Sequence, residues 1–145
     1  MAAVITPEYI AGLVDGEGCI TINKTGRWGA VSLTITNTCK SVLDDVCSYY
    51  QGGLVSLHHR ASPPRRQCWT FRAYGKSAVK IILSIAAYLR IKRNQAALAL
   101  YYWRSRRKLK AESGHKGFKP LPTGITNTRT TIMNKIHLLN KRGVS

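Results

Sequence analysis

The sequence has few acidic residues. Its 145 residues include 23 Lys and Arg but only 6 Asp and Glu, which gives a formal net charge of +17. Such an excess of one sign opposes compaction through self-repulsion, and a bound polyanion relieves it. The cations occur along the whole chain rather than in a terminal tail, so they belong to the body of the protein. This charge predicts nucleic acid as the leading partner, with an anionic membrane surface second.

Three further absences narrow the class of protein. No run approaches the roughly 18 apolar residues of a membrane-spanning helix, and no basic-then-apolar leader opens the chain. The four cysteines form no C-x-x-C pair and the four histidines show no zinc-site spacing, which disfavours a zinc knuckle. We therefore expect reduced thiols, no membrane partner and a soluble protein in the reducing compartment that holds the nucleic acid, such as a bacterial or phage-infected cytoplasm or an organelle interior.

Hydrophobic periodicity predicts helices alternating with pairs of strands in a single domain. An apolar content of 44% is sufficient for one packed core. Helical spacing predicts helices from Thr6-Pro7 to about 15–18, at 43–50 with an end at Gly52-Gly53, at 79–89, from 96 into the basic run, and at 132–139. Alternation predicts strands at 19–24, 30–37, 55–60 and 68–72. This order favours an α+β domain over residues 1–145, with one antiparallel sheet, helices on a single face, and a C-terminal helical part at roughly 111–145.

Strand parity separates an apolar sheet face from a polar one. The predicted polar face has hydroxyl, amide and cationic groups but no carboxylate, whereas a merely solvated face normally mixes both signs. A two-stranded ribbon can enter the major groove, where such groups read base edges. The alternative is that Ser and Thr simply favour strands. This face is predicted to carry Thr21, Asn23, Ser32, Thr34, Thr36, Ser56, His58, Arg60, Cys68, Thr70 and Arg72.

Two of the six acids occupy an unfavourable position. Asp15 and Glu17 lie at the C-terminal end of the first predicted helix, where the helix dipole opposes negative charge. They also weaken simple phosphate binding, unless a divalent cation recruited by the carboxylate makes them a reaction centre. The alternative is that Asp15 caps backbone amides and Glu17 is solvated.

Small residues mark one side of the same helix. Gly12 and Gly16, four residues apart with Ala11 beside them, leave little side chain on that surface. A second helix could therefore approach it closely, although ordinary packing within one chain would use the same residues.

Residues 10–18, which read Ile-Ala-Gly-Leu-Val-Asp-Gly-Glu-Gly, resemble the nine-residue signature of the LAGLIDADG homing endonucleases. Residues 88–96 look like that family's second block with its lysine, and residues 138–143 are similar to a common C-terminal ending. The resemblance covers about the whole chain and implies the family's α-β-β-α-β-β-α fold, a sheet saddle with helices on one face. One copy of the motif implies a homodimer that pairs its motif helices, with Ala11, Gly12 and Asp15 at the interface.

The resemblance also implies an activity: hydrolysis of double-stranded DNA at a long pseudo-palindromic site, dependent on Mg²⁺. It makes Glu17 the metal ligand, with the Gly16 carbonyl completing the shell, and places Lys92 and Asn37 among the catalytic groups. Mn²⁺ is expected to substitute, and Ca²⁺ to occupy the site without supporting cleavage. Apart from the resemblance, a plain phosphate contact or a solvated lysine is the favoured interpretation of Lys92.

DNA recognition would use the polar face. Arg60 and Arg72 are candidates for reading guanine or contacting phosphate, while Arg65, Arg66 and the basic run at 104–110 are expected to follow the backbone. Three alternatives share the basic charge: a maturase that binds intron RNA on the same fold, a non-catalytic DNA-binding protein, and a ribosome-like RNA binder. The last leaves the acidic turn at 16–18 unexplained.

Overall fold

The computed structural model describes residues 4–24, 29–113 and 123–141. Within them the chain forms five helices and four strands in one antiparallel sheet of order β1-β2-β4-β3. The elements are α1 (Pro7–Glu17), β1 (Gly18–Asn23), β2 (Ala30–Asn37), α2 (Lys40–Tyr50), β3 (Leu54–His59), β4 (Cys68–Tyr74), α3 (Gly75–Ile85), α4 (Arg93–Ser113) and α5 (Thr123–Leu139).

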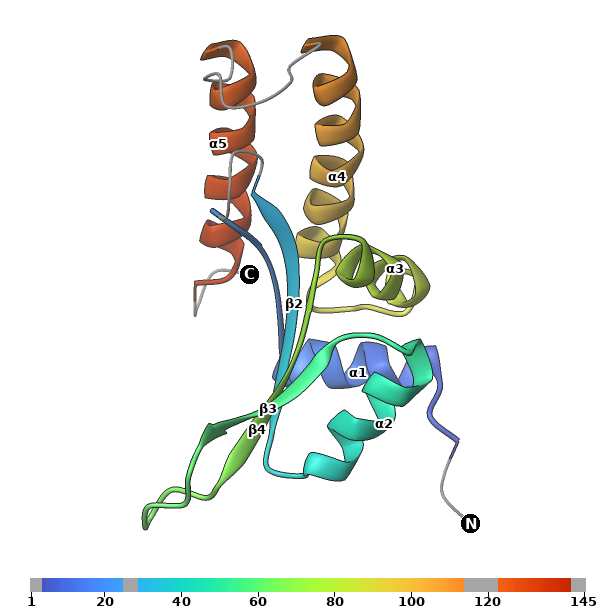
Figure 1. The fold of residues 1–145 in the computed structure, drawn as a ribbon, viewed down its shortest axis with the longest axis vertical. Coiled ribbons are helices and arrows are strands. Elements are labelled where there is room, and N and C mark those ends of the chain that lie inside the picture. The colour runs from blue at the N-terminus through green and yellow to red at the C-terminus, as the bar shows by residue number, and fades with distance from the viewer. Residues whose placement is uncertain (1–3, 25–28, 114–122, 142–145) are drawn as a thin grey trace.

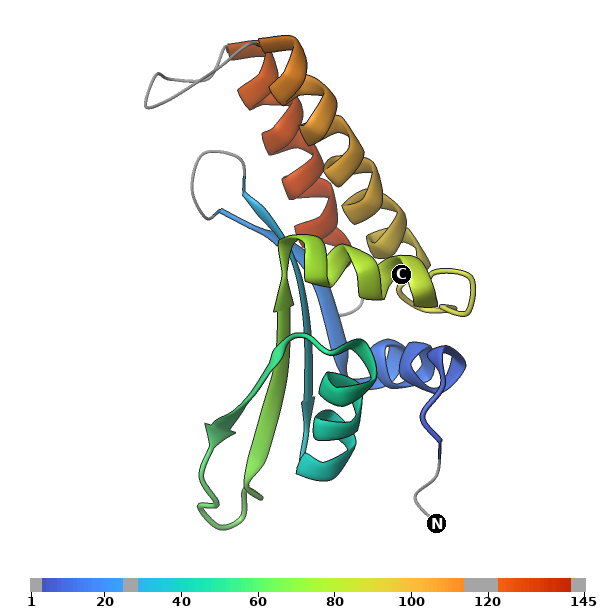
Figure 2. The same ribbon diagram turned by 45° about the vertical axis from the view of Figure 1, so that its right-hand side comes forward.

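The helices lie on one side of a curved sheet, which leaves the other side open (Figures 1 and 2). The core fills the space between the two layers. Alternate residues of β1, β2 and β4, among them Ile20, Leu33, Ile35 and Phe71, are fully buried there. This arrangement confirms the predicted α+β architecture, because a sheet with one apolar face must bury it against another layer.

The first helix begins as its sequence predicts. Thr6 accepts a hydrogen bond from the Tyr9 amide through its side chain, at 3.3 Å, and Pro7 occupies the first turn. The helix ends at Glu17 without a left-handed glycine, since Gly18 is extended with φ −98°. A Cβ on Gly18 would lie 2.8 Å from the Val14 backbone, so this glycine is required for space.

Other helix limits differ from the prediction. α2 ends on Gln51 in the left-handed conformation, one residue before the predicted glycines. α3 stops at Ile85, and Leu89 is buried although it follows the helix. α5 begins well before residue 132.

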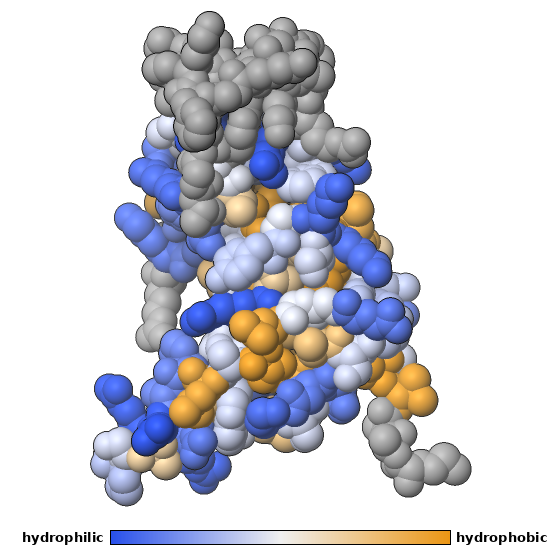
Figure 3. All heavy atoms as spheres, in the orientation of Figure 1, coloured by the Kyte–Doolittle hydropathy of each residue, from blue (hydrophilic) through white to orange (hydrophobic). Residues whose placement is uncertain are grey.

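The β3–β4 hairpin projects beyond the helices (Figures 1 and 2). Its turn is closed by two backbone hydrogen bonds between Ser62 and Arg65, of 3.0 and 2.7 Å. The Pro63-Pro64 bond within it is cis. Arg65 and the following Arg66 are exposed near this turn, and Figure 3 shows mostly hydrophilic residues around the end of the hairpin.

An irregularity in β3 corrects two predicted positions. Leu57 pairs with Trp69, but the next pairing joins His59, not His58, to Cys68. The extra residue interrupts the alternation of side chains, as in a β-bulge. The pairing partner of Cys68 is therefore His59 rather than the predicted His58, and Arg60 lies beyond the end of β3 rather than within it.

The remaining residues predicted for this face share the open side of the sheet, but three of them are buried: Cys68, which is 7% exposed, and two hydroxyl residues. Ser32 is 1% exposed and Thr70 is 2% exposed. Both lie on central strands. Ser32 pairs with Thr21 on one side and Tyr74 on the other, and Thr70 pairs with Thr36 and Ser56. Their prediction as DNA-contacting groups is corrected, because a buried side chain on a central strand does not reach a partner.

The long helices α4 and α5 stand side by side at one end of the sheet (Figures 1 and 2). Ala99 and Tyr102 of α4 and Met133 and Ile136 of α5 are buried in the same core as the sheet. No described helix is both long enough and apolar enough to cross a membrane. Residues 107–110 of the basic run lie in α4, but their side chains are outside the described part of the structure. Their predicted contacts with the DNA backbone therefore stay a prediction.

Candidate active site

Glu17 lies where α1 passes directly into β1, and its side chain is exposed. It lines two hollows at once, one of about 900 Å³ and one of about 350 Å³. The larger hollow also contains Arg90, Lys92 and Lys141, whereas the smaller one contains basic residues from the β3–β4 hairpin. The Glu17 carboxylate thus lies between two hollows that are lined by basic residues.

Three segments far apart in the sequence form the larger hollow. Its lining comes from 16–19, 90–95 and 139–141, which fall within or beside the three blocks that carry the family resemblance. The Asn140 side-chain amide donates to the Ile20 carbonyl at 2.8 Å, and Gln95 donates to the Leu139 carbonyl at 3.3 Å. These bonds tie the C-terminal segment to the strand that follows Glu17.

Asp15 holds the middle segment in place. Its carboxylate accepts hydrogen bonds from the backbone amides of Arg90, Ile91 and Lys92, at 2.7, 3.2 and 2.9 Å. The Lys92 ammonium donates to the Asp15 carbonyl at 2.7 Å. Burial acts to raise the pKa of Asp15, but the three amide bonds and the Lys92 charge outweigh it, so this pKa lies below its usual value.

This geometry gives the Asp15 side chain a structural role. Asp15 caps backbone amides, as one alternative proposed, but the amides belong to residues 90–92 rather than to its own helix. Its side chain is therefore engaged within the chain, and its place at a dimer interface stays a prediction. The same bonds bring Lys92 into the hollow that Glu17 lines.

The smaller hollow joins Glu17 to Asn37, His59, Arg65 and Arg66. Asn37 ends β2, where its side-chain oxygen accepts a bond from the Cys39 amide at 2.8 Å. The structure therefore brings the three predicted catalytic residues around one acidic turn. His59 was missed by the sequence analysis, because strict alternation placed His58 there; no local signal marks the irregularity in β3.

Several polar residues of the larger hollow were also missed. Gln95 and Lys141 lie within the resembling blocks, but helical periodicity gave no reason to single them out. Cys19 lies there too, where burial raises the pKa of its thiol and the Lys92 charge opposes that effect.

The outer surface of α1 is uncovered. Gly12 and Gly16 are exposed, and a Cβ added to either would have no atom within 4 Å. Ala11, by contrast, is 0% exposed and packs in the core with Ile10 and Val14. Its prediction as an interface residue is therefore wrong, since one helical position separates the core side from the outer side.

The described residues contain no cluster of three His, Cys, Asp or Glu side chains that could hold a metal by themselves. The donors present are the exposed Glu17 carboxylate and the backbone carbonyls at the end of α1, of which the Asp15 carbonyl is already bonded to Lys92. Carboxylate and carbonyl oxygens are ligands that Mg²⁺ and Ca²⁺ prefer. The donor set fits a cation that takes most of its shell from water and a bound phosphate.

Comparison with solved structures identifies the fold. The homing endonuclease I-CvuI, crystallised with its DNA target in the presence of Ca, superposes with a TM-score of 0.70 at 21% identity, over 96% of this chain and 85% of that one. The LAGLIDADG homing endonuclease I-GzeII, in complex with a DNA target, also gives 0.70, at 16% identity over 97% of this chain. This chain has the LAGLIDADG homing endonuclease fold.

The share of each solved structure that this chain covers differs from one structure to the next. The chain spans 47% of I-GzeII but 91% of the homing endonuclease I-TnaI, which it matches with a TM-score of 0.60 at 18% identity. No family model and no curated relative matches the sequence. The resemblance on residues 10–18 is thus confirmed by the three-dimensional fold.

Proposed function

We propose that this protein is a site-specific homing endonuclease that hydrolyses phosphodiester bonds in double-stranded DNA, acting as a homodimer with Mg²⁺. The observation that carries the proposal is the position of Glu17 between two basic hollows, with Lys92 fixed beside it by Asp15. A carboxylate among cations repels a phosphate that the cations attract. A divalent cation reconciles the two, and metal-assisted hydrolysis is the chemistry that such a pairing serves.

Glu17 and the Gly16 carbonyl would hold the cation. When bound, a divalent ion supplies charge neutralisation at the phosphate and lowers the pKa of a coordinated water. In the hydrolysis, the water oxygen bonds to phosphorus, one ester P–O bond breaks, and the departing oxygen gains a proton. We expect Mn²⁺ to replace Mg²⁺ and Ca²⁺ to bind without supporting cleavage.

Lys92 and Asn37 would complete the centre from opposite hollows. The Asp15 carbonyl positions the Lys92 ammonium at 2.7 Å, so this cation is preorganised to stabilise charge that develops on the phosphate. Asn37 is held at the end of β2 by its bond to the Cys39 amide and would organise solvent near Glu17.

The open face of the sheet would recognise the DNA sequence. Its accessible polar groups can read base edges in the major groove, and Arg72, exposed on β4, is suited to guanine. Cations near the hairpin turn would contact the phosphate backbone and set the register. The residues proposed to contact DNA are Thr21, Asn23, Thr34, Thr36, Ser56, His59, Arg60, Arg65, Arg66 and Arg72.

Two copies would pair through the exposed side of α1. The absence of side chains at Gly12 and Gly16 permits close helix contact about a two-fold axis. Each subunit would then present one Glu17 to one strand of the duplex. A dimer of identical subunits requires a partly palindromic target.

The test begins with selection of cleaved members from a randomised duplex library in the presence of Mg²⁺, which reports activity, site and symmetry together. On the selected site, Glu17→Gln should keep binding within several-fold, because the basic surfaces remain. Its cleavage should fall by at least about 10³-fold, because the anionic ligand is lost.

The matched control is Asp45→Asn, which removes the same charge from an exposed position on α2 and should cleave like the wild type. Full cleavage by the Glu17→Gln protein would remove the active-site assignment. Binding to intron RNA that survives where duplex binding does not would favour the maturase alternative.

A further inference from the structure

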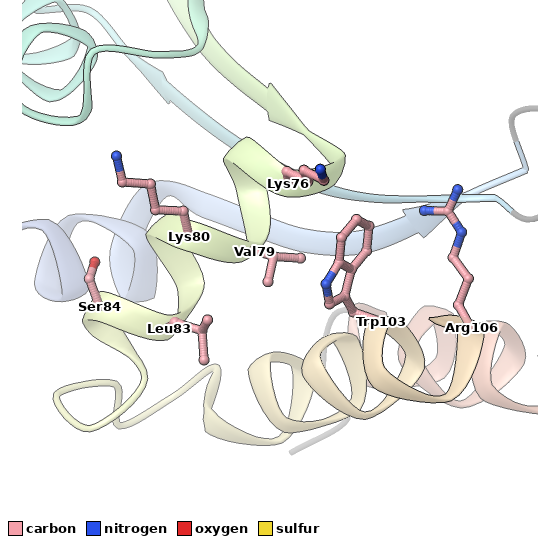
Figure 4. A pocket seen from close by; sticks show the side chains of 7 residues that line it. All are labelled: Lys76, Val79, Lys80, Leu83, Ser84, Trp103 and Arg106. Atoms are coloured by element: carbon pink, nitrogen blue, oxygen red, sulfur yellow. The ribbon is translucent and has the colours of Figure 1, made fainter. Parts of the chain in front are cut away.

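A second groove lies on the helical side of the molecule, between α3 and α4. It has a volume of about 840 Å³. Figure 4 shows that α3 and α4 contribute side chains to the same space from opposite sides. Its lining residues are Lys76, Val79, Lys80, Leu83, Ser84, Trp103 and Arg106.

The middle of this groove is apolar. Val79 and Leu83 of α3 face Trp103 of α4 (Figure 4), and Leu83 is 53% exposed although it is a large aliphatic residue. The Arg106 guanidinium carbon lies 5.2 Å from the centre of the Trp103 ring, which holds the indole at the groove wall. Tryptophan and arginine are residue types enriched in protein-binding hot spots, and here they lie beside an accessible leucine.

The rim of the groove is positively charged. Lys76 and Lys80 are exposed on α3 and Arg106 comes from α4, while no carboxylate is among the described residues that line the groove. Ser84 is already occupied, because its hydroxyl bonds to the Tyr50 hydroxyl at 2.5 Å and to the Ile81 carbonyl at 2.7 Å. The polar contacts left to an occupant are therefore cationic.

This groove does not belong to the proposed DNA-binding surface. α3 packs on the helical side of the sheet, away from the open face (Figure 2). Any occupant would bind independently of a duplex on the saddle.

The charges decide against a second copy of this chain as the occupant. The sequence holds only 6 acids. Asp44 is paired with Lys40 at 2.8 Å, and Asp15 is bonded to residues 90–92. Two surfaces of the same strongly positive molecule would repel each other here.

A nucleic acid also fits this groove poorly. Stacking sites for bases need open aromatic faces, and Arg106 already lies over the Trp103 ring. Val79 and Leu83 offer no stacking plane. An amphipathic helix instead presents apolar residues at i, i+3, i+4 and i+7, which suits a groove between two helices.

We propose that the α3–α4 groove binds an acidic amphipathic helix of another protein. Its apolar side chains pack on Leu83 and Trp103, and its carboxylates pair with the three rim cations. The partner chemistry is thus a helix with one apolar stripe flanked by Glu or Asp. This inference does not depend on the endonuclease function.

The test uses a designed helical peptide with Leu at the stripe positions and Glu on both flanks, labelled for fluorescence anisotropy. A scrambled peptide of identical composition and a 12-nucleotide single-stranded RNA serve as comparison probes. The full-length protein should bind the designed peptide at least tenfold more tightly than the scrambled one, at 150 mM salt.

Two variants place an acid in the groove, one at a rim cation and one at the exposed leucine. Lys80→Glu and Leu83→Glu should each weaken binding of the designed peptide at least tenfold, while Lys135→Glu, an equal charge change at an exposed site on α5, should change it less than twofold. All three should retain DNA cleavage, so failure here is distinguishable from failure of the endonuclease proposal.

Equal binding of the designed and scrambled peptides would overturn the proposal, since it would show only attraction between opposite charges. RNA bound more tightly than the designed peptide, with loss on Leu83→Glu, would reassign the groove to nucleic acid. Circular dichroism of each variant identifies any that fails to fold. If Leu83→Glu fails to fold, Lys80→Glu, at an exposed position, still tests the proposal.

Discussion

At the scale of single residues, the two acids that close α1 have different tasks although one glycine separates them. Asp15 faces inward and fixes residues 90–92 through three backbone amides. Glu17 faces outward and is exposed between the hollows. Successive helical positions point about 100° apart, so a spacing of two places them on different sides. The acid that positions residues 90–92 and the acid proposed to bind the cation are thus separate residues.

Asp15→Asn should lower the free energy of unfolding at neutral pH by roughly 1–2 kcal/mol, since bonds to a charged acceptor are lost from a partly exposed site. The pKa of Asp15 is lowered in the folded protein, so its contribution to the free energy of unfolding is complete above its unfolded pKa, near 3.8. It is lost as the pH falls through the folded pKa. Denaturant unfolding of both proteins at pH 7 and below pH 3 measures this, and the difference should shrink at acid pH.

Lys92→Met is the comparison for that variant. It keeps the three amide bonds to Asp15, so we expect a smaller loss of stability together with slower cleavage. Loss of DNA binding alone, with the cleavage step unchanged, would make Lys92 a phosphate contact. A stability difference between wild type and Asp15→Asn that stayed constant with pH would contradict the assigned role of Asp15.

At the scale of elements, α1 has two dissimilar sides. Ile10, Ala11 and Val14 are buried against the sheet, whereas Gly12 and Gly16 lie on a surface that nothing in the described monomer covers. Glycine within a helix costs roughly 0.5–1 kcal/mol relative to alanine. Two exposed glycines one turn apart are therefore better explained by a close-packing partner than by the monomer.

Gly12→Leu tests this interface. The monomer has room for the side chain and should keep or gain stability, because a residue with higher helix propensity replaces glycine. Pairing of the α1 helices should be prevented by the added bulk. Analytical ultracentrifugation with and without duplex measures it, and Ser48→Leu, at an exposed position on α2, controls for added hydrophobicity. A Gly12→Leu protein that dimerises on DNA like the wild type would place the interface elsewhere.

At the scale of the whole molecule, charge and shape divide the surface into two regions. The open sheet face and its hairpin carry exposed arginines, and the hollows at Glu17 interrupt that positive surface with one acid. The helical side carries a second basic surface whose centre is apolar. The net charge of +17 is thus distributed over both proposed binding surfaces.

Duplex binding should weaken steeply with salt, by about 0.9 in log affinity per log salt for each phosphate neutralised. Replacing Arg65 and Arg66 together by alanine should reduce the magnitude of that slope by about twice 0.9, because two phosphate contacts are lost. The preferred sequence should be unchanged. Arg72→Ala should instead relax the preference at one base pair, with a loss of roughly 1–3 kcal/mol. Titrations at several salt concentrations, on selected and altered sites, measure both. A changed sequence preference in the hairpin variant would give its arginines a reading role.

The sequence by itself determined the order of elements, the buried face of each strand and the acidic turn at 15–17, because period, capping and turn chemistry act over a few residues. It could not determine that Asp15 binds amides 75 to 77 residues away, or that Asn140 bonds to a strand 120 residues before it. Only the packed fold brings such segments together. Only the tertiary structure shows that Ser32 and Thr70 are buried and that His59 rather than His58 pairs with Cys68. Burial and register depend on neighbouring strands, which no local pattern specifies.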